Sequence, residues 1–210
     1  MLRFMFALLV MASSCYSQVI TSPTTWTKAM SPITVTSVNI YSILTIEAGV
    51  EVRFTGGGKL TLWNGNYSKL IVNGTPEQPV LFRSTTGDPW RGLSVVSRST
   101  RPVIRLNNAV FENLGATTRV FDLINADAYF YNCSFSGLAV VPSGTQAGQT
   151  TSFWTPSATN PPIGGLENCE ISGFTTGIVF TPGIVMIDCD FTNVLNPVRG
   201  RLLGVSALGL

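Results

Sequence analysis

The chain contains no histidine, and only 11% of its 210 residues are charged. Without histidine or a Cys-x-x-Cys motif, the sequence has almost nothing from which a zinc site could be built. The 13 lysines and arginines nearly balance the 11 aspartates and glutamates, whereas nucleic-acid-binding proteins usually carry clustered basic residues. We therefore predict no metal, no cofactor and no nucleic-acid partner.

Long amphipathic helices are also absent from the sequence. The region after residue 17 shows no 3.6-residue hydrophobic periodicity, and short β-rich runs are instead separated by turn residues. The runs in the first half cover residues 33–36, 43–46, 50–54, 60–62, 70–72, 80–82 and 93–96. This pattern predicts an all-β protein.

The N-terminus has the pattern of a secretory signal peptide. Arg3 provides a basic start, residues 4–12 form a short apolar stretch, and Cys15 and Ser17 are small residues suited to a cleavage site after Ser17. This apolar stretch, like the one at 202–210, is too short to cross a bilayer. The sequence therefore predicts a secreted, extracellular or cell-surface protein without a membrane span of its own.

A six-residue pattern occurs four times in the second half, starting at Asn108, Asn132, Asn168 and Asp188. Position one is Asn or Asp, position two is small, position four is bulky and apolar, and position six is Asn or Gly. Positions two and four share one face, because side chains alternate along a strand. Position six tolerates left-handed backbone angles, which predicts a corner there. Spacings of 24, 36 and 20 residues indicate a coiled repeat array.

The repeat also predicts ladders of like side chains from coil to coil. Position two holds three cysteines, Cys133, Cys169 and Cys189, where cysteine acts as a small buried hydrophobic residue. An odd number of cysteines in a secreted protein can also indicate an intermolecular disulfide or a reactive thiol. Neighbouring coils would also allow a Cys169–Cys189 disulfide. The asparagines at position one are expected to form a hydrogen-bonded structural ladder: Asn108, Asn132 and Asn168.

Three segments of the first half carry a family resemblance: residues 44–54 (LTIEAGVEVRF), residues 70–84 (LIVNGTPEQPVLFRS) and the Trp-Arg-Gly-Leu at 90–93. They resemble the right-handed parallel β-helix repeat proteins of the pectin-lyase-like superfamily, although Ala48 replaces the customary proline. These segments are most similar to secreted bacterial β-helix proteins and bark-beetle-type animal surface proteins. Neither group is defined by a catalytic motif. The resemblance implies a single-stranded parallel β-helix, a solenoid of about six or seven coils.

The expected domain organisation has four parts. These are a signal peptide at 1–17, an N-terminal lead-in or cap at 18–32, the parallel β-helix at 33–195, and a C-terminal tail or truncated end at 196–210.

The long interval between the second and third copies of the repeat predicts an insertion at about 142–162. Insertions in repeat arrays often form a binding surface, so Trp154 is a candidate for stacking on a sugar ring or a partner. The alternative is that Phe153 and Trp154 fold back over the wall of the coils.

The catalytic motifs that the superfamily's hydrolases share are missing. Polygalacturonase-like hydrolases resemble one another in four motifs: Asn-Thr-Asp, Asp-Asp, Gly-His-Gly and Arg-Ile-Lys. None of these four motifs occurs in this sequence. Asp188 and Asp190 are the candidates for the paired carboxylates of glycoside hydrolysis. Asp188, however, occupies the Asn position of the repeat and is expected to be a turn residue. We therefore assign no catalytic residue.

Candidate ligand-binding residues remain on the outer surface. Three arginines could form a strip that faces an acidic glycan: Arg83, Arg91 and Arg105. The alternative is that they are solvated charges on the outer face. Asn66 and Asn73 lie in Asn-x-Ser/Thr sequons at predicted turns and are candidate glycosylation sites.

These features favour a noncatalytic secreted or cell-surface module for adhesion, which binds an extracellular glycan or a surface protein. The alternative is a divergent carbohydrate-active enzyme, a polysaccharide lyase or hydrolase, that acts on an acidic polysaccharide. Binding to an ice or crystal surface would require a regular threonine array, and Thr34, Thr36 and Thr45 are too irregular for one. The sequence predicts no oligomeric state.

Overall fold

The computed structural model describes residues 16–55, 57–63, 68–85, 89–96, 100–115, 119–123, 125–137, 152–154, 163–174, 176–179, 184–194 and 196–199. Within these ranges the protein consists of β-strands, and the 3₁₀ turn η1 (Lys28–Met30) is the one helical element. Every strand pairing in the described ranges is parallel. The predicted all-β class is confirmed.

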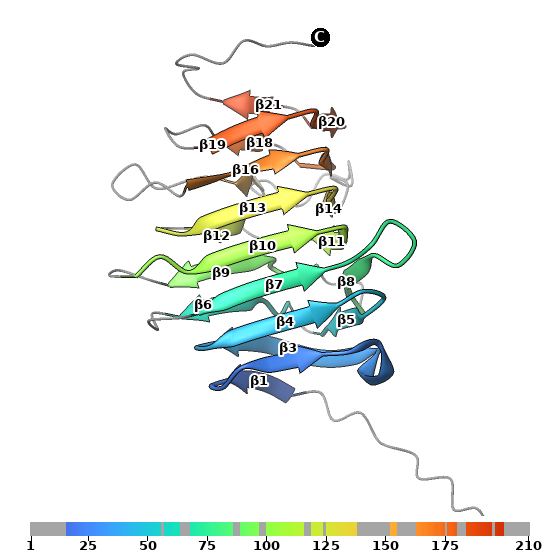
Figure 1. Ribbon diagram of the computed structural model, residues 1–210. Coiled ribbons are helices and arrows are strands. Elements are labelled where there is room, and N and C mark those ends of the chain that lie inside the picture. Colours follow the sequence, from blue (N-terminus) through green and yellow to red (C-terminus); the bar gives the residue numbers. More distant parts are fainter. Residues whose placement is uncertain are drawn as a thin grey trace, which may run out of the picture.

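The strands form two sheets, and neighbours within a sheet come from successive turns of the chain (Figure 1). The seven-stranded sheet forms what we call wall 1. Its strands are, in spatial order, β2 (Thr24–Trp26), β4 (Ile43–Glu47), β7 (Lys69–Asn73), β10 (Val103–Asn107), β13 (Asp127–Tyr131), β16 (Ile163–Glu167) and β19 (Ile184–Ile187).

The fourteen-stranded sheet turns at β3 (Ile33–Ile40), whose first half pairs with β5 and whose second half pairs with β6 and β1 (Tyr16–Ile20). One arm, wall 2, contains β5 (Glu51–Phe54), β8 (Val80–Ser84), β11 (Ala109–Leu114), β14 (Ser134–Gly137), β17 (Glu170–Ser172) and β20 (Asp190–Thr192). The other arm, wall 3, contains β6 (Leu60–Trp63), β9 (Leu93–Val96), β12 (Arg119–Leu123), β15 (Ser152–Trp154), β18 (Thr176–Val179) and β21 (Asn196–Arg199).

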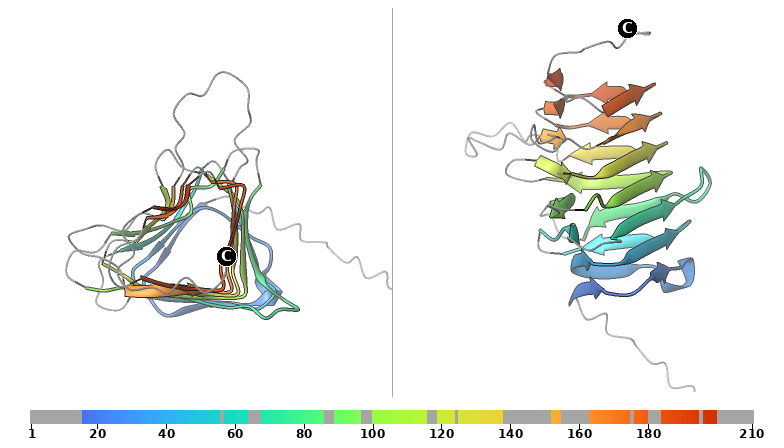
Figure 2. Two further views of the ribbon diagram at one scale, coloured as in Figure 1. Left: turned by 90° about the horizontal axis from the view of Figure 1, so that it is seen from above. Right: turned by 60° about the vertical axis from the view of Figure 1, so that its left-hand side comes forward.

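The chain passes through walls 1, 2 and 3 in turn and then returns to wall 1, one strand further along. Viewed from the end of the stack, the three walls outline a triangle (Figure 2). Register is kept from coil to coil, so Leu44, Leu70 and Ile104 lie side by side on neighbouring strands. The parallel sheets therefore curl around a common core, an arrangement that is compatible with the expected β-helix.

The two sheets extend beyond the residues expected to hold the coils. In the predicted lead-in, β2 pairs with β4, and in the predicted tail β21 pairs with β18. β1 includes Tyr16 and Ser17, which cleavage at the predicted signal-peptide site would remove. The regular strand pairing thus starts before residue 33 and continues past residue 195.

Aromatic rings stack in the core behind wall 2. Phe82, Phe111 and Phe135 are fully buried and occupy the same register position in β8, β11 and β14. Their ring centroids are 4.6 Å apart between Phe82 and Phe111 and 5.0 Å apart between Phe111 and Phe135. Ile171 and Phe191 continue this row in the next two coils. Position four of the repeat therefore supplies the centre of the core.

Position one of the repeat forms the corner between wall 1 and wall 2. Its backbone φ lies between +48° and +51° in all four copies: Asn108, Asn132, Asn168 and Asp188. Asn and Asp adopt this left-handed conformation more readily than other non-glycine residues. The corner expected at position six is left-handed in three copies only, because Gly137 instead continues β14.

The substitution Phe111→Ala should lower the free energy of unfolding by about 3–5 kcal/mol, because it leaves a cavity between two stacked rings. Urea denaturation of the purified protein measures this loss. Val110→Ala, on the outward side of the same strand, is the matched control and should cost much less. Equal losses at the two positions would contradict the assignment of the ring stack to the core.

Candidate functional site

The outer surface of wall 1 carries exposed tyrosines on β13. Ala128 and Phe130 of this strand point into the core, whereas Tyr129 and Tyr131 are exposed by 42% and 41%. Side chains alternate along a strand, so the two tyrosines share the outer face. In neighbouring strands, Tyr129 is flanked by Arg105 and Gly165.

A groove of about 390 Å³ opens on wall 1 where Gly165 interrupts the outward column of side chains. Tyr129 and Tyr131 of β13 line one side of it, and Val185 and Ile187 of β19 line the other. Between them, β16 contributes the floor. A Cβ atom at Gly165 would lie 2.9 Å from the Val185 carbonyl oxygen, so the approach of β19 also favours glycine here. The absence of a side chain at Gly165 therefore both allows the close approach of β19 and leaves the groove open.

Polar side chains also line the groove. The Arg105 guanidinium carbon lies 5.2 Å from the centroid of the Tyr129 ring, a cation–π contact that orients both side chains. Asn107 and Glu167 also line the groove. The lining thus combines a guanidinium, an amide and one carboxylate with exposed aromatic and aliphatic surface.

Exposed hydrophobic side chains gather at this groove. Four of the eight large hydrophobic residues that are exposed in the described part of the chain line it: Tyr129, Tyr131, Val185 and Ile187. Single exposed apolar residues are ordinary on a protein surface, but a cluster beside a hollow indicates an interaction site. This groove is our candidate functional site.

The predicted ligand-binding arginines lie apart. Arg83 belongs to β8 of wall 2, Arg91 precedes β9 of wall 3, and Arg105 belongs to β10 of wall 1. The structure therefore does not bring them together as one strip, and of the three only Arg105 lines the groove.

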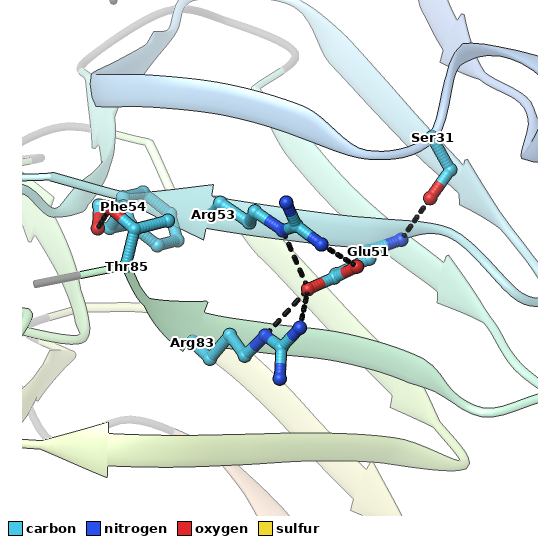
Figure 3. A network of polar contacts seen from close by, with 6 residues as sticks. All are labelled: Ser31, Glu51, Arg53, Phe54, Arg83 and Thr85. Atoms are coloured by element: carbon cyan, nitrogen blue, oxygen red, sulfur yellow. Dashed lines mark hydrogen bonds and ion pairs between the residues drawn. The ribbon is translucent and has the colours of Figure 1, made fainter.

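Arg83 takes part in an ion-pair network on wall 2 (Figure 3). Arg53 donates to both carboxylate oxygens of Glu51, with Nε 2.7 Å from Oε1 and Nη2 2.8 Å from Oε2. Arg83 also donates to Oε1 of Glu51, and the Glu51 backbone N–H donates to Ser31 Oγ at 2.9 Å. The hydrogen bond from Arg53, followed by that from Arg83, lowers the pKa of Glu51, although partial burial opposes the shift.

Trp154 lies in a strand of the coil wall. The structure places it in β15, where its backbone is in register with Phe121 of β12 and Ile178 of β18. Residues 152–154 are therefore part of wall 3, although they fall inside the predicted insertion. The rest of the range 142–162 lies outside the described residues, as does the candidate glycosylation site Asn66. The other candidate, Asn73, is exposed at the end of β7.

The position-one asparagines make contacts between coils. Asn132 Nδ2 lies 3.4 Å from Asn108 Oδ1, and Asn108 Nδ2 donates to the Gly74 carbonyl at 3.1 Å. The backbone N–H of Asn168 donates to the Ile187 carbonyl of the next coil at 3.0 Å.

Asp188, the fourth corner residue, is exposed, and Asp190 lies beside Glu170 on the outer face of wall 2.

The three cysteines occupy corresponding positions in successive coils as free thiols, so no Cys169–Cys189 disulfide is formed. Cys133 and Cys169 are buried and Cys189 is half-buried. Hydrogen bonding to the Cys133 sulfur, together with burial, raises the pKa of Cys169 to about 12. Hydrogen bonding to Cys169 and burial also raise the pKa of Cys189. Protonated thiols are poor nucleophiles and metal ligands, which favours a packing role.

Sequence reasoning missed Tyr129, Tyr131 and Gly165. A signal for the tyrosines exists in Asp-Ala-Tyr-Phe-Tyr at 127–131, where alternation puts both on the face opposite Phe130. The position of Gly165 beside Tyr129 follows only from the register of β13 and β16, which lie on either side of the long interval in the repeat.

Comparison with known proteins gives no match: no family model, no curated protein and no solved structure shows significant similarity to this chain. Among the described residues, no helix has the length and hydrophobicity that crossing a bilayer requires. The same residues contain no group of three or more acidic or cysteine side chains arranged to hold a metal ion.

The ion-pair network predicts an acid-sensitive contribution to stability. The folded-state pKa of Glu51 is lowered below 4.5, so the contribution is present above this value and is lost as the pH falls below it. The substitution Glu51→Gln should remove this loss, as measured by urea denaturation at a series of pH values. High salt should weaken the difference, because the arginine side chains are partly exposed. Parallel pH profiles for the wild type and variant would contradict the prediction.

Proposed function

We propose that the protein is a noncatalytic module of an extracellular or cell-surface protein that binds a glycan or a surface protein. Its scaffold in this proposal is a right-handed, single-stranded parallel β-helix of the pectin-lyase-like type. The parallel sheets and the passage of the chain through three walls support the scaffold. The signal-peptide pattern supports the location.

The groove on wall 1 is the observation that carries the binding function. Its volume of about 390 Å³ lies within the range of roughly 300–1,000 Å³ that is common for small-ligand sites. Tyrosine can contribute apolar area and a polar hydroxyl at a small cost in conformational entropy, which suits it to recognition. Beneath the groove, β13 and β16 are each paired in parallel on both sides, and β19, at the end of the described sheet, is paired with β16. Most of the site is therefore built on strands that the sheet holds in place.

The composition of the groove favours binding over hydrolysis. Glycoside hydrolysis commonly uses two carboxyl groups, about 5–9.5 Å apart, on either side of the scissile bond. Among the described residues, Glu167 is the one carboxylate that lines the groove. The arginines that would support action on an acidic polysaccharide lie on separate walls. A divergent lyase or hydrolase is therefore the less favoured alternative.

Binding and cleavage can be measured in parallel on protein expressed from the full sequence. We expect the purified protein to be retained by at least one surface in a panel of immobilised oligosaccharides and extracellular proteins. Polygalacturonate incubated with the same sample should give neither unsaturated products nor new reducing ends. Product formation that depends on the protein would contradict the noncatalytic assignment, and absence of retention on every surface would contradict the binding function.

A further inference from the structure

We infer that the groove on wall 1 binds a neutral saccharide, with Tyr129 and Tyr131 as its apolar platform. This inference rests on the proposed binding function and names the ligand class and the site. It concerns the outer face of β13, β16 and β19, whose side chains are distinct from those that fill the core.

The dimensions of the groove suit a small ring-shaped ligand. Tyr129 and Tyr131 are two residues apart on one strand, which separates their Cα atoms by about 7 Å. Tyr129 and Val185 lie on either side of β16, two strand spacings or about 10 Å apart. Since Gly165 has no side chain, the space between them stays open. The surface that lines this hollow is much smaller in area than the surface that a stable protein–protein interface usually buries.

The apolar part of the lining matches one face of a sugar ring. The C–H groups on the face of a pyranose carry partial positive charge, whereas the face of an aromatic ring carries partial negative charge. Arg105 lies against Tyr129 and restricts the orientation of that ring before a ligand arrives. Val185 and Ile187 supply further apolar surface on the opposite side, where they are exposed by 55% and 48%.

The polar part of the lining matches hydroxyl groups. A hydroxyl both donates and accepts hydrogen bonds, so a saccharide site needs donors and acceptors close together. Arg105 offers donors, Glu167 offers acceptors, and the Asn107 amide offers both. These three side chains project from β10 and β16, the strands on either side of the tyrosine-bearing β13.

The charge of the groove favours a neutral saccharide over a uronate. Arg105 and Glu167 bring one positive and one negative charge to its lining. Near the start of β13, Arg101 Nε donates to Asp127 Oδ1 at 2.8 Å, so a carboxylate balances the charge of this arginine. An acidic polymer would instead be favoured by an excess of positive charge along its path.

Isothermal titration calorimetry with neutral oligosaccharides of glucose, mannose and N-acetylglucosamine tests this inference, with oligogalacturonate as the acidic comparison. We expect at least one neutral series to bind, and more tightly than oligogalacturonate. Tyr129→Ala and Tyr131→Ala should each weaken this binding about tenfold or more. Tyr129→Phe should retain most of it, because the platform is kept.

Tyr41→Ala is the matched control. Tyr41 is exposed by 44%, similar to the groove tyrosines, but it stacks on Trp63 away from the groove. Its replacement should leave saccharide binding unchanged. Circular dichroism and thermal midpoints establish that each variant is folded. If an alanine variant unfolds, Val185→Glu tests the opposite side of the groove at an exposed position and should also weaken binding.

The outcomes separate this inference from the proposed function. Retention on an extracellular protein without binding of any neutral oligosaccharide would overturn the saccharide inference and leave the binding function standing. Tighter binding of oligogalacturonate would overturn the neutral ligand class. Neutral-saccharide binding that all groove variants preserve would overturn the site. Failure to bind any saccharide or protein in the panel would overturn both proposals.

Discussion

In-register stacking of parallel coils is the constraint on which the rest of the structure depends. Each interior strand bonds to a strand of the coil before it and to a strand of the coil after it, so a residue's place within its coil determines its neighbours. Phe82, Phe111 and Phe135 meet because they hold the same place in three successive coils. A one-residue shift would turn these rings outward, because side chains alternate along a strand. In-register stacking therefore determines, for all three walls at once, which residues face the core.

The corners between walls 1 and 2 maintain this register. In each of the four coils that contain the repeat, one Asn or Asp with a left-handed backbone turns the chain from wall 1 to wall 2. The same residues contact the adjacent coil, as Asn132 does with Asn108. The residue at position two follows the corner directly: Ala109, Cys133 and Cys169 are buried there, and Cys189 is half-buried. The six-residue repeat is thus explained by the turning of the chain at position one and by the packing of side chains in the core.

The outer surface is less constrained, and wall 1 differs along its length. In β4 and β7 the outward residues include Thr45 and Lys69, whereas β13 presents two tyrosines and β16 a glycine. Solvent-facing positions can vary in this way without disturbing the inward rows. A groove with exposed aromatic rings, one guanidinium and one carboxylate can consequently form on a scaffold whose interior is periodic.

The sequence by itself determined the β class, the inward positions of the repeat and the presence of corners, because these follow from local alternation and from the conformational preferences of Asn and Gly. It did not place the groove. Tyr129 and Gly165 are separated by the long interval in the repeat, and only the pairing of β13 with β16 makes them neighbours. The tertiary structure likewise separated Arg83, Arg91 and Arg105, which are close in sequence, because successive parts of one coil belong to different walls. Proximity on the surface depends on register between coils, and register is a property of the whole stack.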